Sequence, residues 1–443
     1  MSRWGRRARR SAAVLALSGG LVLGAGLAVQ GVGDDGAPAA ALAVPADPTV
    51  AVGDPAAAAR SLQQRLRRLP GDWQAWASLG NAYVQQSALT ADPTWYSKAE
   101  QAFARSLQER SDGNDAALVG QAGLAASRHD FARARSIAEQ ALETNPSSAA
   151  AHAVLVDALV ELGEDDAATD VLRRLLELRP GIPAYTRASY LFELRGDHEG
   201  ARLALDEALG LAVDPADAAF AHRYLGELAW GTGDLPEAQR QFEAGLERLP
   251  GSAPLLAGLA RVAAARGETE LALRLWTDVV QRLPEPGYLS ELGDLYAALG
   301  RQAEAQAQYA VVDATVQLFR DAGADPDLEH VLYAADHGDA AGALAAAQRL
   351  WTSRKSVHAA DAYAWALHVN GRSDQALALA REAQRLGTRS ALFDYHRGMI
   401  ELSLGDRAGA RRSLTSALAL NPAFSVQHAP RAQQALAELG GPS

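Results

Sequence analysis

The sequence predicts an all-α fold, a superhelical solenoid of about ten helix pairs with a capping helix at each end. Three observations predict it. A glycine followed five residues later by an alanine recurs at intervals of 33 to 38 residues. Between these marks the apolar residues follow the spacing of one helix face. Prolines often stand twelve residues beyond the alanine, where a second helix has to end.

Residues 1–33 form a leader that is first basic and then uncharged. Five arginines lie within the first ten residues, and residues 11–33 carry no charge. As a helix this uncharged stretch would span about 34 Å, enough to cross a bilayer core of about 30 Å. Arginines on its N-terminal side predict that the rest of the chain is exported.

Two forms of this leader remain open, a cleaved signal peptide and a retained membrane anchor. Its six glycines make the span weakly apolar, which favours a signal peptide. The small-residue cleavage candidate, residues 41–43, lies far downstream, which favours an anchor. A buried N-terminal helix in a cytoplasmic protein is the third reading.

Residues 34–54 mix Ala, Pro, Gly and Asp without helical periodicity, so they predict a flexible tether. The helical pattern then continues through residues 55–440 and predicts a single solenoid. Its two longest intervals indicate insertions near 211–217 and 313–326. The second insertion lengthens a helix ahead of Gly323 and Pro326, so we expect the superhelix to bend there.

The repeat marks have a simple physical explanation. A glycine that ends a helix can adopt the left-handed conformation without a Cβ clash. An alanine early in the second helix lets two backbones approach closely, where a leucine would overpack. The acids after some glycines, such as Asp197, Asp234 and Asp406, can cap the second helix. The marks are Gly163, Ala168, Gly196, Ala201, Gly233, Ala238, Gly267, Ala272, Gly300, Ala305, Gly338, Ala343, Gly371, Ala376, Gly405 and Ala410.

This pattern resembles the tetratricopeptide repeat family, in which an aromatic residue, a leucine-glycine pair, a tyrosine, an alanine, a phenylalanine and a proline recur over 34 residues. The first unit carries Trp76, Leu79, Gly80, Tyr83, Ala99 and Phe103. Another carries Leu225, Gly226, Ala238, Phe242 and Pro250, and a third carries Leu292, Gly293, Tyr296, Ala305 and Tyr309. The resemblance covers roughly residues 57–422 and implies a right-handed superhelix. The chain also resembles exported or membrane-anchored repeat proteins of GC-rich bacteria with the same leader, tether and array.

The register places ten helix pairs, which begin near residues 73, 115, 149, 182, 219, 253, 286, 324, 357 and 391. Residues 58–69 read as an unpaired second helix that caps the N-terminal end, and residues 430–439 read as the C-terminal cap. A solenoid needs such caps because each unit buries its apolar face only against its neighbours.

The net charge and the lack of cysteine exclude several classes of function. The formal net charge is −11, and the leader contributes +5, so the remainder carries −11 − 5 = −16. An acidic body argues against nucleic-acid binding, which draws most of its affinity from Lys and Arg. A cytoplasmic DNA-binding regulator would also need a basic reading helix, and the sequence has none. The chain has no cysteine, which excludes disulfides, zinc-thiolate sites and cysteine nucleophiles.

No catalytic motif is present, so we expect no enzyme and no cofactor. Neither lysine follows a glycine, which excludes a phosphate-binding loop. His198-Glu199 begins a zinc-protease motif, but Arg202 stands where the second histidine is required.

Histidines gather late in the chain, with acids near them in sequence. A metal- or pH-responsive accessory factor on the same solenoid is therefore the alternative function, although histidines that bond to neighbouring units explain the pattern as well. We assign no metal ligand. The histidines are His330, His337, His358, His368, His396 and His428, and the acids are Asp336, Asp339 and Asp361.

The resemblance implies that the first helix of each pair lines a concave groove where protein or peptide partners bind. Two clusters of the residue types that anchor interfaces fall on adjacent units of this face. The predicted partner-binding residues are Tyr190, Arg223, Glu227, Trp230, Trp365, His368, Tyr395 and Met399. We therefore expect an extracytoplasmic scaffold for protein partners, either secreted or tethered to the membrane through residues 11–33.

Overall fold

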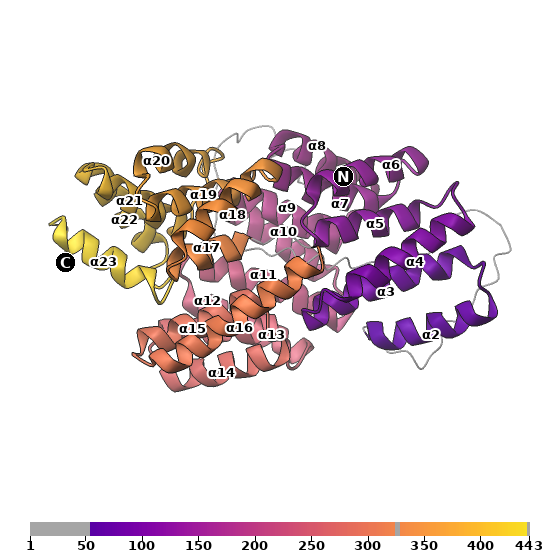
Figure 1. The fold of residues 1–443 in the computed structure, drawn as a ribbon, viewed down its shortest axis with the longest axis horizontal. Helices are drawn as coiled ribbons and strands as arrows, with labels where there is room; N and C mark the ends of the chain where they lie inside the picture. Colours follow the sequence, from indigo (N-terminus) through magenta and orange to yellow (C-terminus); the bar gives the residue numbers. More distant parts are fainter. Residues whose placement is uncertain (1–53, 324–327, 441–443) are drawn as a thin grey trace.

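The computed structural model describes residues 54–323 and 328–440, and within them every regular element is an α-helix (Figure 1). Ten successive helix pairs stand between two single helices, α2 (Pro55–Arg68) and α23 (His428–Glu438). The fold is therefore the predicted solenoid of helix pairs with a cap at each end. The leader and nearly all of the tether lie outside the described residues. Across the two described ranges, no helix is both long and apolar enough to cross a membrane.

Each pair consists of a first and a second helix packed against each other. The first helix of each pair begins at the predicted residue, with two exceptions. Helix α11 begins four residues before the predicted residue 219, and α17 begins after residues 324–327, which the structure does not describe. The pairs are α3 (Trp73–Thr90) and α4 (Trp95–Glu109), α5 (Asp115–Ser127) and α6 (Phe131–Thr144), α7 (Ala149–Leu162) and α8 (Asp165–Leu178), α9 (Ile182–Glu193) and α10 (His198–Gly210), α11 (Pro215–Gly231) and α12 (Leu235–Arg248), α13 (Ala253–Ala265) and α14 (Thr269–Arg282), α15 (Pro286–Ala298) and α16 (Gln302–Asp321), α17 (Leu328–Asp336) and α18 (Ala340–Ser353), α19 (Val357–Val369) and α20 (Ser373–Glu382), and α21 (Ala391–Ser403) and α22 (Arg407–Leu420).

The turns inside the pairs have the conformation that the repeat marks require. All eight marked glycines have positive φ, for example 78° at Gly163 and at Gly405. All eight marked alanines are fully buried. The backbone amides of Gly200, Glu237 and Gly409 each donate to the aspartate three residues before them, which confirms the predicted N-caps.

Glycines on the first helices allow close contact with an aromatic ring of the second helix. A Cβ at Gly80 would lie 2.4 Å from the ring of Phe103, and a Cβ at Gly293 would lie 2.3 Å from the ring of Tyr309. Gly258 of one pair meets Phe242 of the preceding pair at a similar distance of 2.4 Å. The aromatic side chain therefore packs directly on helix backbone, within a pair and between pairs.

The two insertions lengthen helices. The first extends α11 to 17 residues, and its start is set by Pro215 and by a bond from the Ala216 amide to the side chain of Asp214. The second extends α16 to 20 residues. The far end of α16 brings Phe319 against the core of the first two pairs.

The superhelix is wound so tightly that its successive turns touch. Hydrogen bonds join residues that are 191 to 194 apart in sequence, among them Arg354 to Glu161, Thr388 to Leu194, and Asn421 to Trp230. At about 34 residues per pair, one turn takes between five and six pairs. The loop before a first helix in the later turn thus rests on the end of a first helix in the earlier one.

An ion pair inside this contact is almost completely buried. The Arg354 guanidinium donates from Nη2 and Nε to one carboxylate oxygen of Glu161, at 2.6 and 3.0 Å, and the two side chains are 6% and 5% exposed. The backbone amide of Lys355 also donates to the Glu161 carbonyl. Gly163 leaves room for this approach, since a Cβ there would lie 2.5 Å from the Lys355 carbonyl oxygen.

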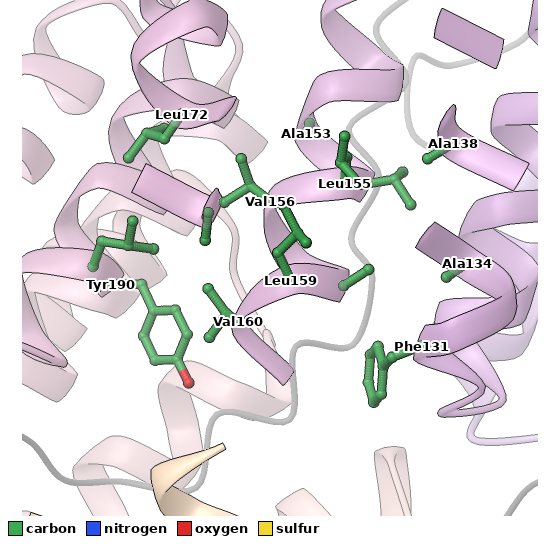
Figure 2. Packing of buried hydrophobic residues seen from close by; sticks show 14 of the residues in the cluster. Phe131, Ala134, Ala138, Ala153, Leu155, Val156, Leu159, Val160, Leu172 and Tyr190 are labelled. Carbon is green, nitrogen blue, oxygen red and sulfur yellow. The ribbon is translucent and has the colours of Figure 1, made fainter. Parts of the chain in front are cut away.

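The largest apolar core spans both turns. Figure 2 shows the buried side chains of α7 between Phe131, Ala134 and Ala138 of α6 on one side and Leu172 and Tyr190 on the other. Val357, Ala360 and Phe393 of α19 and α21 belong to the same cluster. Helices α19 and α21 of the later turn therefore pack against α7 and α9 of the earlier turn.

Candidate functional site

A cavity of about 820 Å³ lies inside the superhelix, and its lining includes Trp230 and Asn421, which join the two turns. Its walls come mainly from the first helices α11, α13, α15, α17, α19 and α21, as expected for the concave side of the array. The exposed side chains of Leu89 and Leu249 are among its lining residues, so the cavity opens to solvent there. Its volume is within the range of about 300–1,000 Å³ typical of ligand pockets.

The first wall carries a network of arginines and glutamates on α11, α13 and α15. Arg261 forms two hydrogen bonds to Glu291, at 2.6 and 2.8 Å, and a longer one of 3.3 Å to Glu227. Arg223 lies 3.8 Å from Glu227 through its Nε atom, which has no hydrogen-bond partner among the described residues. The Arg223 side chain is 27% exposed, so it remains accessible from the cavity. This wall therefore presents a charged surface with one arginine that is only loosely held.

A second part of the lining, the histidine wall, carries two histidine–aspartate pairs. His396 contacts Asp361 through Nδ1 at 2.9 Å, and His428 contacts Asp336 through Nε2 at 3.0 Å. The indole of Trp365 donates to the second oxygen of Asp336 and stacks on the His396 ring, with centroids 4.2 Å apart. Both pairs join different repeat units, which fixes the ring orientations.

The surroundings of Asp336 shift its pKa away from that of an exposed carboxylate. Burial by itself raises the pKa of Asp336, but the hydrogen bond and charge of His428 lower it below its ordinary value. Behind the wall, burial and the nearby His396 lower the pKa of His368 to about 4. His368 is therefore neutral at physiological pH.

Three of the eight predicted groove residues, Arg223, Glu227 and Trp230, line the cavity. Trp230 is partly exposed, and its carbonyl accepts a hydrogen bond from Asn421 of the later turn. Their place at one wall follows from the register, since all three project from α11.

Tyr190 lies on the predicted face but does not line the cavity. It is 6% exposed and stacks on His358 of α19, with ring centroids 6.4 Å apart. Burial raises the pKa of its hydroxyl well above the ordinary value. The later turn of the superhelix occupies the place where we expected a partner to contact this residue.

The other four predicted residues lie in the layer behind the histidine wall. Trp365 and Tyr395 are 5% and 1% exposed, and Tyr395 stacks on His428 at 4.8 Å. His368 bonds to Ser373, and Met399 packs against the core. These side chains support the wall from the protein side, because the aromatic rings stack on the histidines.

Four of the six late histidines, namely His330, His337, His396 and His428, bond to neighbouring units. His337 contacts Asp294 at 2.7 Å, and His330 contacts Arg320 at 2.9 Å. Burial lowers the pKa of His330. In the part of the chain that the structure describes, no group of three or more His, Asp or Glu side chains has the arrangement of a metal site.

Sequence reasoning noted Asp361, His396 and His428 but did not bring them together. The pairing of His396 with Asp361 spans 35 residues, about one repeat, so a shared position on adjacent first helices is the signal that predicts it. His428, at the start of α23, reaches Asp336 of α17 over 92 residues. No local pattern predicts the second contact.

Tetratricopeptide repeat family models match residues 49–106, 125–188 and 225–281. No curated protein matches the sequence.

The chain is similar to several solved structures. One is PilW, a type IV pilus biogenesis factor, with 20% sequence identity and a TM-score of 0.38, covering 45% of this chain and 92% of that one. A second is the APC/C hetero-tetramer Cut9–Hcn1, with 15% identity and a TM-score of 0.38, covering 86% and 93% of the two chains. A third, from Parabacteroides merdae, has 18% identity and a TM-score of 0.34, covering 59% and 99%.

Proposed function

Since this chain is a tetratricopeptide repeat protein, we propose that it is a scaffold that holds a segment of a partner protein inside the cavity of its superhelix. The observation that carries this proposal is the wall formed by Arg223, Glu227 and Trp230, which is solvent-accessible and belongs to a cavity of about 820 Å³. Arg and Trp are the side chains that most often dominate binding energy at protein interfaces. Contact along this wall is reversible and needs no chemistry.

We propose further that the scaffold works outside the cytoplasm. The five arginines and the uncharged residues 11–33 support export, either with removal of the leader or with its retention as an anchor. A fusion of alkaline phosphatase after residue 54 tests this, because that enzyme is active only after export. An inactive fusion would contradict the proposal.

An affinity capture tests the binding site. The full-length protein is immobilised through a C-terminal tag and exposed to the envelope extract of its own cells, in parallel with an Arg223→Ala, Trp230→Ala double variant. We expect a protein that the wild type retains and the variant loses, while the variant keeps its helicity.

The chain offers a matched control for this capture. Trp73 and Arg110 are the same two residue types in the first repeat, where the guanidinium lies 4.8 Å from the ring centroid, and neither residue lines the cavity. A Trp73→Ala, Arg110→Ala variant should therefore retain the same protein as the wild type. Equal losses in the two double variants would contradict the assignment of the cavity wall.

A further inference from the structure

The joint between the pairs α15–α16 and α17–α18 is held by a group of hydrogen-bonded side chains, the His337 cluster. It consists of Asp294 from α15, Tyr309 from α16, and Tyr333 and His337 from α17. The Tyr309 hydroxyl donates to Asp294 Oδ1 at 2.9 Å, and the Tyr333 hydroxyl donates to the Tyr309 carbonyl at 3.2 Å. A small apolar group of α15 and α16 packs on Tyr333 beside these bonds. The joint therefore depends on polar contacts as well as on apolar packing.

Both ring nitrogens of His337 face hydrogen-bond acceptors. Nε2 lies 2.7 Å from Asp294 Oδ1, and Nδ1 lies 2.8 Å from the backbone carbonyl oxygen of Tyr333. A carbonyl and a carboxylate only accept hydrogen bonds, and a neutral imidazole has a single N–H. A neutral His337 would therefore turn a lone pair toward one of the two oxygens, whereas the imidazolium donates to both. The geometry selects the protonated ring.

The surroundings of His337 also favour its positive charge. Burial by itself lowers the pKa of His337, but the hydrogen bond and charge of Asp294 raise it above its ordinary value of 6.5. The ring of Tyr333 stacks on His337 with centroids 4.6 Å apart, and a cation is attracted to an aromatic face. The side chains of His337 and Asp294 are 14% and 18% exposed and line the cavity, so water can exchange the proton.

The charged and titratable groups that face His337 come from three helices. They are Asp294 of α15, Tyr309 of α16, and Tyr333 and Asp336 of α17. Asp336 is bonded in turn to the side chains of His428 and Trp365. Within the described ranges, no lysine or arginine bonds to Asp294 or His337. The His337 ring is therefore the cation that balances Asp294.

Comparable joints earlier in the array use arginine instead. Arg187 of α9 donates to Asp157 of α7 at 2.5 Å, and Arg261 of α13 donates to Glu291 of α15 at 2.6 Å. Arginine keeps its charge throughout the physiological pH range, whereas histidine loses its charge near neutral pH. In both bonded rings of the histidine wall, one nitrogen meets no acceptor among the described residues, so their bonds do not require a second proton. His337 thus combines a joint between two pairs with a required proton.

We propose that His337 is a pH-sensitive latch between the two parts of the superhelix that meet at this joint. While His337 is protonated, it satisfies Asp294 and the Tyr333 carbonyl together and holds α17 on α15. Loss of the proton leaves Asp294 without its cation and one acceptor facing a lone pair, so the joint loosens. The latch acts without a partner, and because α15 and α17 both line the cavity, its opening changes the cavity wall.

The direction of the pH effect follows from the raised pKa of His337. Its contribution to stability is fully present below pH 6.5 and is lost as the pH rises through the higher pKa of the folded chain. The latch is therefore closed in mildly acidic solution and open in mildly alkaline solution.

A titration of the histidine rings by NMR tests the protonation. The full-length protein is labelled with carbon-13 at histidine, and the signal of His337 is assigned by its loss in His337→Gln. We expect a titration midpoint above 6.5. Asp294→Asn should bring the midpoint to 6.5 or below, because the ring stays buried and the attracting charge is gone. Asp278→Asn, at an exposed position of α14, is the matched control and should leave the midpoint unchanged.

Distances measured by pulsed electron paramagnetic resonance test the latch itself. The chain has no cysteine, so two introduced cysteines carry the spin labels without background. Ala303→Cys on α16 and Gln348→Cys on α18 are exposed positions on the two sides of the joint. We expect a narrow distance distribution at about pH 5.5 and a broader or shifted one at about pH 8.5, where the histidine is neutral. In Asp294→Asn the distribution should no longer change with pH.

The joint held by Arg261 and Glu291 provides the control for these distances. Ala303→Cys is paired with Arg274→Cys, an exposed position of α14 on the far side of that joint. Since arginine does not titrate in this range, the distribution of the control pair should be the same at both pH values.

Several results would overturn the proposal. One is a His337 midpoint at or below 6.5 in the wild type, or a midpoint that Asp294→Asn does not move. Another is a distance distribution across the His337 joint that is the same at both pH values. A pH change that persists in Asp294→Asn, or that appears equally across the arginine-held joint, would assign the effect to other groups and equally refute the latch.

Discussion

The contact between successive superhelical turns makes a strong prediction at Glu161. Glu161→Ala removes the carboxylate that receives both hydrogen bonds from Arg354, inside a pair that is only 5–6% exposed. Removing one partner of a buried ion pair costs about 3–5 kcal/mol, because the other charge stays in a medium of low dielectric. Since repeat arrays can unfold unit by unit, the effect should first be local.

Hydrogen exchange detected by mass spectrometry measures this local effect. In Glu161→Ala we expect faster exchange in α7 and also in α19, although the two helices are almost two hundred residues apart in sequence. A urea titration should show an earlier transition. Faster exchange in α7 with unchanged exchange in α19 would refute the stacking of the turns.

A surface pair provides the control for this experiment. Arg135 and Glu164 also join neighbouring units, at 2.6 Å, but their side chains are 37% and 42% exposed. Glu164→Ala should cost less than about 1 kcal/mol, because water screens the charges. It should leave exchange in α19 unchanged.

Two further predictions concern packing and pH. Ala272 is fully buried where two helices meet, so Ala272→Leu should lower the melting temperature through overpacking of about 1–3 kcal/mol; an unchanged melt would contradict the repeat register. Burial raises the pKa of Glu193 from 4.5 to about 8, against the opposing bond from Ser189. The unfolded chain releases this proton at lower pH than the folded one, so the free energy of unfolding should fall between pH 4.5 and 8. Glu193→Gln should reduce that fall by about 1–3 kcal/mol in urea titrations, and an unchanged pH profile would contradict the assigned burial.

The repeat architecture could be predicted from the sequence because its signals are local. Gly163 and Ala168 stand at the positions where a left-handed turn and a close helix contact are needed, and the structure shows that turn and that burial. The same local register assigned Arg223 and Trp230 to one helix face, and both side chains line the cavity. Their role in binding a partner stays a prediction.

The contact between successive turns could not be predicted from the sequence. The pitch of the superhelix depends on small rotations between neighbouring pairs that accumulate over the whole array. Tyr190 illustrates the consequence, since its helix face is the predicted one but His358 covers it from the next turn. Glu161 offered a weak signal, as an acid near the end of a mostly apolar helix, and the structure shows that it is buried. The partner of that acid, Arg354, cannot be read from any local pattern.

The most direct test of the account is photo-crosslinking from inside the cavity. Benzoylphenylalanine is introduced in place of Trp230, and in a second strain in place of Trp73, which does not line the cavity. The account predicts a crosslinked partner polypeptide from position 230, weakened by an additional Arg223→Ala change, and none from position 73. A partner crosslinked only from position 73, or none from position 230, would contradict binding inside the superhelix.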